Sequence, residues 1–127
     1  MEQYLIDTNV VSDYFSASLS TAGMTFMDTV IDAVPNLSVI TQIELLCWDT
    51  NAVTEQKIKE FIDDSIILDI STDVVARCIN LRKGKRIKTP DAIIAATALA
   101  YGYTIITRNE KDFINVSGLK IVNPMKL

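Results

Sequence analysis

The 127-residue sequence contains no histidine and little glycine or cysteine. Without histidine, the protein has neither an imidazole general base nor a histidine-ligated metal. The four glycines are spread along the chain and form no glycine-rich phosphate loop. Cys47 and Cys78 each lie in an apolar segment without a second cysteine nearby, which favours neither a zinc site nor a disulfide. Any chemistry must therefore depend on carboxylates.

Long hydrophobic runs are also missing, although 49% of the residues are hydrophobic. No run approaches the roughly 20 apolar residues that span a bilayer. The first residues do not form the charged segment and apolar core of an export signal. We therefore expect no membrane partner and a cytoplasmic location. The length suits a single compact domain over residues 1–127.

An excess of basic charge is absent as well. Twelve basic residues face sixteen acidic ones, and the net charge is −4, whereas proteins that bind nucleic acid usually present a basic surface. Five of the twelve basic residues nevertheless lie in one acid-free segment, residues 82–88 (RKGKRIK). A local basic surface is therefore compatible with the acidic total.

Short apolar runs alternate with helical patterns along the chain. The predicted strands are 4–6, 37–40, 66–70, 104–106 and 120–122, and the predicted helices are 8–15, 24–34, 41–49, 53–63, 73–83 and 90–101. Apolar runs without alternation are typical of strands covered on both faces. We expect an α/β fold, a three-layer α/β/α sandwich around a short, mostly parallel sheet of about five strands.

Four acidic residues follow predicted strands. Asp7 comes directly after the first strand, and Glu44 lies in the first turn of the helix after the second. Asp91 lies in the first turn of the last long helix, and Asp112 follows the fourth strand. Because parallel strands end at the same edge of a sheet, we expect these four side chains to meet there.

Each acid also has a purely structural interpretation. Thr41 and Glu44 fit a capping box, Asp91 suits the start of a helix capped by Thr89, and Asp7 could cap the first helix. Asp112 could belong to a helical turn that begins at Asn109. Taken one at a time, capping is the more common use of such residues.

The four acids together are harder to explain by capping. Two carboxylates about 5 Å apart repel by roughly 3 kcal/mol at an effective dielectric constant of ~20, whereas a helix dipole contributes about 1 kcal/mol. A divalent cation would offset the repulsion. Oxygen-only sites suit Mg²⁺ or Mn²⁺, and such ions, one or two per site, support hydrolysis of phosphodiester bonds.

Four stretches of the chain resemble one known family. "LIDTNVVSDYF", "SVITQIELL", "DAIIAATALAYGYTIITRNEKDF" and "LKIVNP" are similar, in this order, to the PIN domain and within it to VapC-type toxins of bacterial toxin–antitoxin pairs. The resemblance implies an endoribonuclease whose Asp7, Glu44, Asp91 and Asp112 bind one or two Mg²⁺ or Mn²⁺ ions. It also implies an RNA substrate, a homodimer, and an antitoxin protein that blocks the site.

Individual roles can be assigned as hypotheses. Asp7 and Asp91 are expected to bind metal directly, Glu44 to bind through water or to activate the nucleophile, and Asp112 to hold a second or transient ion. The neighbouring polar side chains are candidates for orienting these carboxylates by hydrogen bonds, although turn and cap chemistry explains them equally well; they are Thr8, Asn9, Thr107 and Asn109.

The basic segment also has two interpretations. A basic run after a helix favours the helix C-terminus and then continues as a solvated loop. Because it leads directly into Asp91, its side chains could instead steer an RNA backbone towards the acids; these are Lys83, Lys85, Arg86 and Lys88.

An acidic metal-binding α/β module without nuclease activity is the alternative. A receiver-like signalling domain has a comparable length and an acidic magnesium pocket. It would need an aspartate that closes the third strand and a lysine that closes the fifth. Here Asp69 lies within the third predicted strand and Lys120 begins the fifth, so the pattern favours the nuclease.

Overall fold

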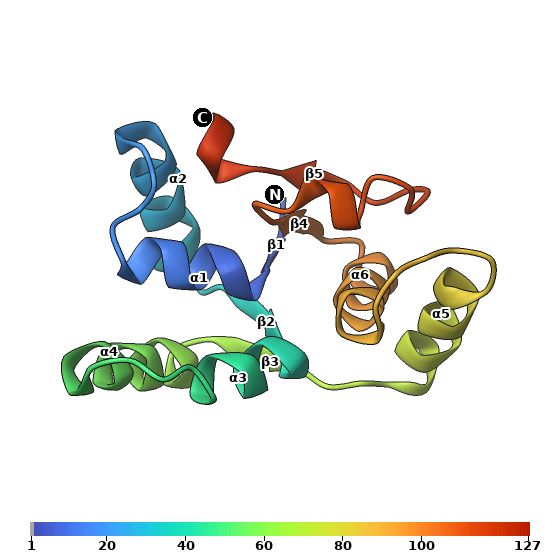
Figure 1. The fold of residues 1–127 in the computed structure, drawn as a ribbon, viewed down its shortest axis with the longest axis horizontal. Helices are drawn as coiled ribbons and strands as arrows, with labels where there is room; N and C mark the ends of the chain where they lie inside the picture. Colours follow the sequence, from blue (N-terminus) through green and yellow to red (C-terminus); the bar gives the residue numbers. More distant parts are fainter. Residues whose placement is uncertain (1) are drawn as a thin grey trace.

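The computed structural model describes residues 2–127, which form a five-stranded parallel sheet covered by helices (Figure 1). The strands are β1 (Tyr4–Ile6), β2 (Asn36–Ser38), β3 (Ile66–Leu68), β4 (Thr104–Ile106) and β5 (Ile121–Val122). The helices are α1 (Thr8–Phe15), α2 (Thr21–Asp32), α3 (Val39–Leu46), α4 (Ala52–Asp63), α5 (Thr72–Arg82) and α6 (Thr89–Tyr101). Two short 3-10 helices, η1 (Glu110–Asp112) and η2 (Pro124–Lys126), complete the chain.

The sheet has helices on both faces. Leu5 and Ile105 are paired on neighbouring strands and pack with α5 and α6, whereas their successors Ile6 and Ile106 pack with α1, α2 and α4. Successive strand residues point to opposite faces, so two adjacent isoleucines or leucines fill two cores. Figure 1 shows α5 and α6 on one side of the strands and α1, α2 and α4 on the other. The predicted three-layer α/β/α sandwich is confirmed.

The strand order creates a crevice at one edge of the sheet. The order is β3-β2-β1-β4-β5, with every neighbouring pair parallel. The chain therefore runs outward from β1 on one side and resumes at β4 on the other. In such sheets the loops diverge at this switch point and leave a crevice at the carboxyl ends of the strands.

The second predicted strand ends earlier than expected. β2 stops at Ser38, whose side chain caps α3 by accepting a hydrogen bond from the Ile40 amide at 3.1 Å. Glu44 consequently lies in the second turn of α3, and the prediction of a first-turn position was wrong. The capping box is wrong too, because Thr41 is a fully buried residue inside the helix. Ser38 provides an equally good cap three residues earlier.

The start of α6 also differs from the prediction. Lys88 occupies the N-cap position without a side-chain hydrogen bond, and Thr89 and Pro90 are the first two helical residues. Thr89 is therefore not the cap. Proline fits the first turn because its missing N–H would have no partner there. Upstream, α2 begins at Thr21, three residues before the prediction, with Ser20 as its cap.

The third strand is shorter than predicted, so Asp69 directly follows β3 instead of lying within it. A receiver domain is nevertheless excluded by topology, because its sheet has the order 2-1-3-4-5, whereas β3 here is an edge strand. Within residues 2–127, no helix combines the length and apolarity needed to cross a membrane.

Candidate metal centre

Asp7 lies between the end of β1 and the start of α1. It is only 5% exposed, and both carboxylate oxygens accept hydrogen bonds. The Thr107 hydroxyl donates to Oδ2 at 2.8 Å, the Asn9 side chain donates to the same oxygen at 3.0 Å, and the Thr8 amide donates to Oδ1 at 2.9 Å. Burial raises the pKa of Asp7 despite these donors. The carboxylate is thus fixed in orientation, and no lysine or arginine of residues 2–127 forms an ion pair with it.

Glu44 projects from α3 towards α1. The Thr8 hydroxyl donates to its Oε1 at 2.6 Å and lies 3.2 Å from the Thr41 hydroxyl. Glu44 itself is exposed. Thr8 therefore connects two acids, since its amide bonds to Asp7 and its hydroxyl bonds to Glu44.

Asp91 lies in the first turn of α6 and is half-buried. Its pKa is raised to about 6, first by burial and then by the negative charges of Asp112, Asp7 and Glu44, with Lys88 opposing the shift. No residue between 2 and 127 donates a hydrogen bond to its carboxylate. The electrostatic effect of three acids from separate segments indicates that they lie near Asp91.

Asp112 closes η1 and is exposed. Its amide donates to the Asn109 carbonyl at 3.1 Å, while its carboxylate accepts no hydrogen bond within the described chain. Asn109 contacts the rest of the site through its backbone, because its amide donates to the Thr107 hydroxyl at 3.1 Å. Of the four residues proposed to orient carboxylates, Thr8, Asn9 and Thr107 donate hydrogen bonds to an acidic side chain. Asn109 bonds only to the backbone of Asp112 and reaches Asp7 through the Thr107 hydroxyl.

The donor set fits a hard divalent cation, since it consists of carboxylate oxygens from four segments. As the side chains lie, however, no three acidic or cysteine residues in the range 2–127 are grouped closely enough to hold one ion. Glu44 is instead turned towards Thr8. Binding of an ion by more than two of these residues therefore requires rotation of exposed side chains such as Glu44 and Asp112.

The basic segment connects α5 to α6, next to the start of α6. Lys83, Lys85, Arg86 and Lys88 are all exposed. The Lys85 ammonium donates to the Asn115 carbonyl at 2.8 Å, and the Arg82 guanidinium donates to the Ile87 carbonyl at 3.2 Å. The first bond holds the loop against the chain that follows Asp112, and the second lies within the basic segment itself.

One ion pair near the acids, between a buried aspartate and an exposed arginine, was missed by the sequence analysis. The Arg108 guanidinium donates to Asp13 Oδ1 at 3.1 Å, and Asp13 is only 7% exposed. The available signal was an acid on the apolar face of a predicted helix, beside Val10 and Val11, because a buried acid requires a cationic partner. The position of that partner in the chain had no sequence signal.

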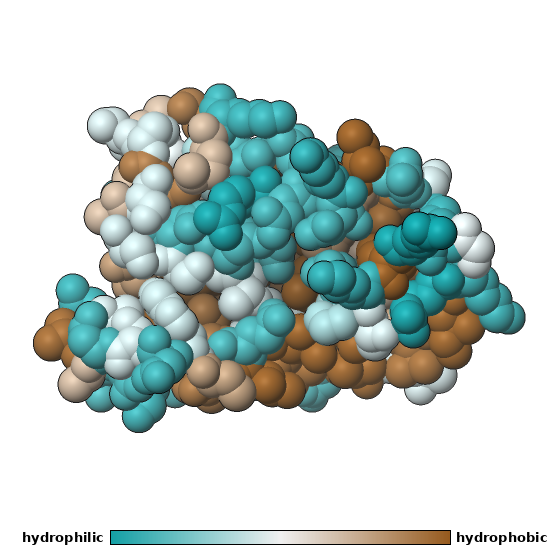
Figure 2. Space-filling model, viewed as in Figure 1, coloured by the Kyte–Doolittle hydropathy of each residue, from teal (hydrophilic) through white to brown (hydrophobic). Residues whose placement is uncertain are grey.

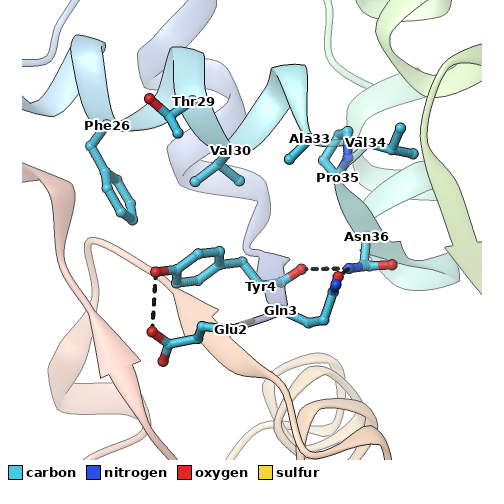
Figure 3. Close-up of a pocket in the computed structure, with 10 residues that line it drawn as sticks. All are labelled: Glu2, Gln3, Tyr4, Phe26, Thr29, Val30, Ala33, Val34, Pro35 and Asn36. Carbon is cyan, nitrogen blue, oxygen red and sulfur yellow. Dashed lines mark hydrogen bonds between the residues drawn. The ribbon is translucent and has the colours of Figure 1, made fainter.

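A second pocket lies at the opposite, amino edge of the sheet (Figure 3). The rings of Tyr4 and Phe26 meet edge to face with centroids 5.5 Å apart. The Asn36 side chain donates to the Tyr4 carbonyl at 2.9 Å, and the Tyr4 hydroxyl donates to Glu2 at 3.2 Å. These polar groups bond to one another. The pocket therefore offers no set of free polar atoms that converge on a bound molecule or ion.

Comparison with known proteins identifies the family. Residues 4–119 match the family model described as "PIN domain", and the chain therefore belongs to the PIN domain family. This confirms the predicted resemblance at the level of the family.

Individual relatives agree with this assignment. The chain is 28% identical over 136 aligned positions to "VapC ribonuclease Y4jK" of Sinorhizobium fredii, which covers 94% of this chain and 96% of that protein. A 49-residue segment is 45% identical to "Ribonuclease VapC1" of Rickettsia felis and spans 37% of each chain. A chain of the "Toxin-antitoxin complex from Klebsiella pneumoniae" superposes with a TM-score of 0.75 at 33% identity, covering 96% of this chain and 98% of that one.

Proposed function

We propose that this protein is a divalent-metal-dependent endoribonuclease that acts as the toxin of a toxin–antitoxin pair. The single observation that carries the proposal is the convergence of acids on Asp91, whose pKa is raised first by burial and then by the charges of Asp112, Asp7 and Glu44. Acids from four separate segments are brought together although their charges repel, which a structural role does not require. The relatives named as ribonucleases support RNA as the substrate.

Asp7 and Asp91 are the proposed direct ligands of one Mg²⁺ or Mn²⁺ ion. Glu44 would bind through water or accept the proton of the attacking water, and Asp112 would hold a second or transient ion. When bound, the metal supplies charge neutralisation at the scissile phosphate and lowers the pKa of the attacking water.

The surrounding hydroxyl and amide groups have a defined part in this proposal. Thr107, Asn9 and the Thr8 amide fix both oxygens of Asp7, so the ligand geometry exists before an ion arrives. The Thr8 hydroxyl holds Glu44 near the site, from which Glu44 can rotate inward.

RNA would approach along the basic segment. Lys83, Lys85, Arg86 and Lys88 stand beside the start of α6 and would attract phosphates that the acids alone would repel. Because the Lys85 ammonium is held by Asn115, part of this surface is ordered before RNA binds.

An antitoxin protein would block the site from the other side. A pocket between α1 and α3 is lined by Thr8, Glu44, Leu45 and Trp48. Apolar side chains therefore lie beside one of the acids in this pocket. A partner seated there would cover Glu44 and exclude RNA. The similar chain in the toxin–antitoxin complex from Klebsiella pneumoniae supports a partner of this kind, and a cytoplasmic location would bring toxin, antitoxin and RNA together.

A homodimer is also part of the proposal. Figure 2 shows hydrophobic side chains along the lower edge of the molecule, near α3 and the chain between β3 and α5. Exposed apolar residues of α3, β3, α5 and the connection from β3 to α5 are Ile43, Leu46, Ile66, Ile70, Val75 and Ile79. A second copy would cover this surface. Single exposed apolar residues are common on proteins, whereas neighbouring ones such as these are typical of an interaction site. Light scattering of the purified protein tests the dimer.

The direct test of the nuclease is incubation of the purified protein with labelled RNA and Mg²⁺. We expect cleavage that stops when a chelator is added and is absent from Asp7→Asn. Cleavage that survives both treatments would contradict the proposal. Metal binding without any cleavage would favour a non-catalytic acidic module instead.

A further inference from the structure

The C-terminal segment, residues 123–127, contacts the turn that carries Asp112. We propose that Asn123 and Lys126 are positioning residues, which hold this turn so that Asp112 faces the other acids. The inference rests on the proposed function, because it gives a purpose to the position of Asp112. It extends that function to residues that lie outside the acidic cluster.

Two side chains of the segment bind the turn directly. The Asn123 side chain donates to Glu110 Oε2 at 3.0 Å and to the Arg108 carbonyl at 3.3 Å. The Lys126 ammonium lies 2.6 Å from the same Glu110 oxygen. Glu110 is the first residue of η1 and Asp112 is the last. These bonds therefore restrain the turn that contains Asp112.

The opposite side of the turn is held by α1. The Arg108 amide donates to Asn9 Oδ1 at 3.1 Å, and the Arg108 guanidinium donates to Asp13 Oδ1 at 3.1 Å. Asp112 itself is exposed, and its carboxylate is bonded to nothing in the described part of the chain. Its position is therefore set by the turn, and the turn is fixed from two sides.

The C-terminal segment has its own anchor on α2. Pro124 is buried, and a Cβ added at Gly23 would stand 2.6 Å from the Pro124 carbonyl oxygen. The Ser20 hydroxyl donates to the Leu127 carbonyl at 3.2 Å. The contact at Gly23 leaves no room for a methyl group, so an alanine there must displace the segment, although Gly23 contacts no acid of the site.

Loss of these contacts is expected to weaken metal binding without removing a ligand. Groups that orient ligands typically change metal affinity by about 10- to 100-fold when they are lost. A turn freed on one side also regains conformational freedom that must be lost again when the ion binds.

Two variants test the inference in the full-length protein. Lys126→Gln removes the ion pair on the surface, and Gly23→Ala displaces the segment from a distance. Mn²⁺ affinity is measured by calorimetry, and amide hydrogen exchange is measured on metal-free protein. We expect about tenfold weaker Mn²⁺ binding in both variants, at the low end for orienting groups. Faster exchange should be confined to residues 108–112 and the C-terminal segment.

Two control variants separate positioning from general destabilisation. Lys126→Arg keeps the positive charge and should retain wild-type affinity. Thr25→Ala alters an exposed side chain on α2 that bonds only within its own helix, and it should change nothing.

The outcomes distinguish this inference from the proposed function. If the wild-type protein binds Mn²⁺ and Asp7→Asn does not, but Lys126→Gln and Gly23→Ala bind like wild type, the positioning role alone is overturned. If the wild-type protein binds no Mn²⁺, the metal site and the positioning role both fall. Faster exchange across the whole of Lys126→Gln would also overturn it, since the effect would then be global.

Discussion

Acids at the two edges of the sheet have pKa values shifted in opposite directions. At the amino edge, Glu2 is exposed, and the Thr104 and Tyr4 hydroxyls donate to it at 2.5 and 3.2 Å. The Thr104 bond is the main reason that the pKa of Glu2 is lowered. At the carboxyl edge, Asp91 has no donor within residues 2–127, and burial and three neighbouring acids raise its pKa to about 6.

The same contrast occurs within one turn. Lys126 and Asn123 lower the pKa of Glu110, whereas Asp112, two residues later, is left without a partner in the described chain and acts on Asp91 by repulsion. The number of acids in a segment therefore does not identify a site. What identifies it is whether the fold provides each acid with a donor or leaves it facing other acids.

The largest expected effect is a difference in RNA cleavage between variants at the two edges. Asp91→Asn should lower the rate of RNA cleavage about 100-fold or more, because it replaces a proposed metal ligand with a neutral amide. Glu2→Gln at the amino edge should leave the rate unchanged. The rates are compared under single-turnover conditions with Mg²⁺. Equal losses in both variants would show that the two edges do not differ in function.

The basic segment is expected to contribute to RNA binding because it lies near the carboxyl edge of the sheet. In an Asp7→Asn background, the triple change Lys85→Gln, Arg86→Gln and Lys88→Gln should weaken RNA binding about tenfold. It should also lower the slope of log K against log salt by about 2, since each phosphate contact contributes about 0.7 for single strands. Fluorescence anisotropy across a salt series measures both quantities.

A charge-matched control removes three exposed lysines elsewhere. Lys57, Lys59 and Lys120 lie on α4 and before β5. Their replacement by glutamine should change the salt slope less than the triple change in the basic segment. An equal change would assign the attraction of RNA to total charge instead of to position.

Stability should change with pH in opposite directions at the two edges. The folded pKa of Asp91 is raised from 3.8 to about 6, so folded protein binds more protons than unfolded protein between these values. The contribution of Asp91 to stability is therefore present at low pH and lost as the pH rises through about 6. For Glu2, whose pKa is lowered, the contribution is present at neutral pH and lost on acidification.

Metal-free protein makes this difference measurable. At pH 7, Asp91→Asn should raise the free energy of unfolding by about 1 kcal/mol, a value reduced for solvent screening of a half-exposed group. The two proteins should be nearly equal at pH 4. Glu2→Gln should instead be slightly less stable than wild type at pH 7. Urea titrations with a chelator provide the values, and a destabilised Asp91→Asn at pH 7 would contradict the repulsion.

The last expected effect concerns Thr8, which bonds to two of the acids. Thr8→Val removes the hydroxyl that bonds to Glu44 but keeps the amide that bonds to Asp7. Cleavage should fall by about tenfold, at the low end for groups that orient ligands. Thr54→Val on α4, where the threonine hydroxyl bonds to no acid in residues 2–127, is a suitable control. A Thr8→Val variant with full activity would show that cleavage does not depend on the hydrogen bond between Thr8 and Glu44.

Much of the architecture could be predicted because strand burial is encoded locally. The runs around Leu5 and Ile105 are apolar at consecutive positions, which requires cover on both faces. Helix starts were less predictable. Ser38 and Thr41 are both good caps, and the choice depends on where β2 stops pairing with β3, which is a tertiary contact.

The candidate site shows the same division. By themselves, the order and types of residues specified a two-sided parallel sheet with acids directly after its strands, because hydrophobic burial and side-chain alternation act over a few neighbouring residues. Only the tertiary structure decided that Asp91 faces three other acids, that Arg108 pairs with Asp13, and that Asn123 reaches Glu110. Those partners are distant in the chain, and their charges act on one another only after the strands have paired and brought the loops to one edge.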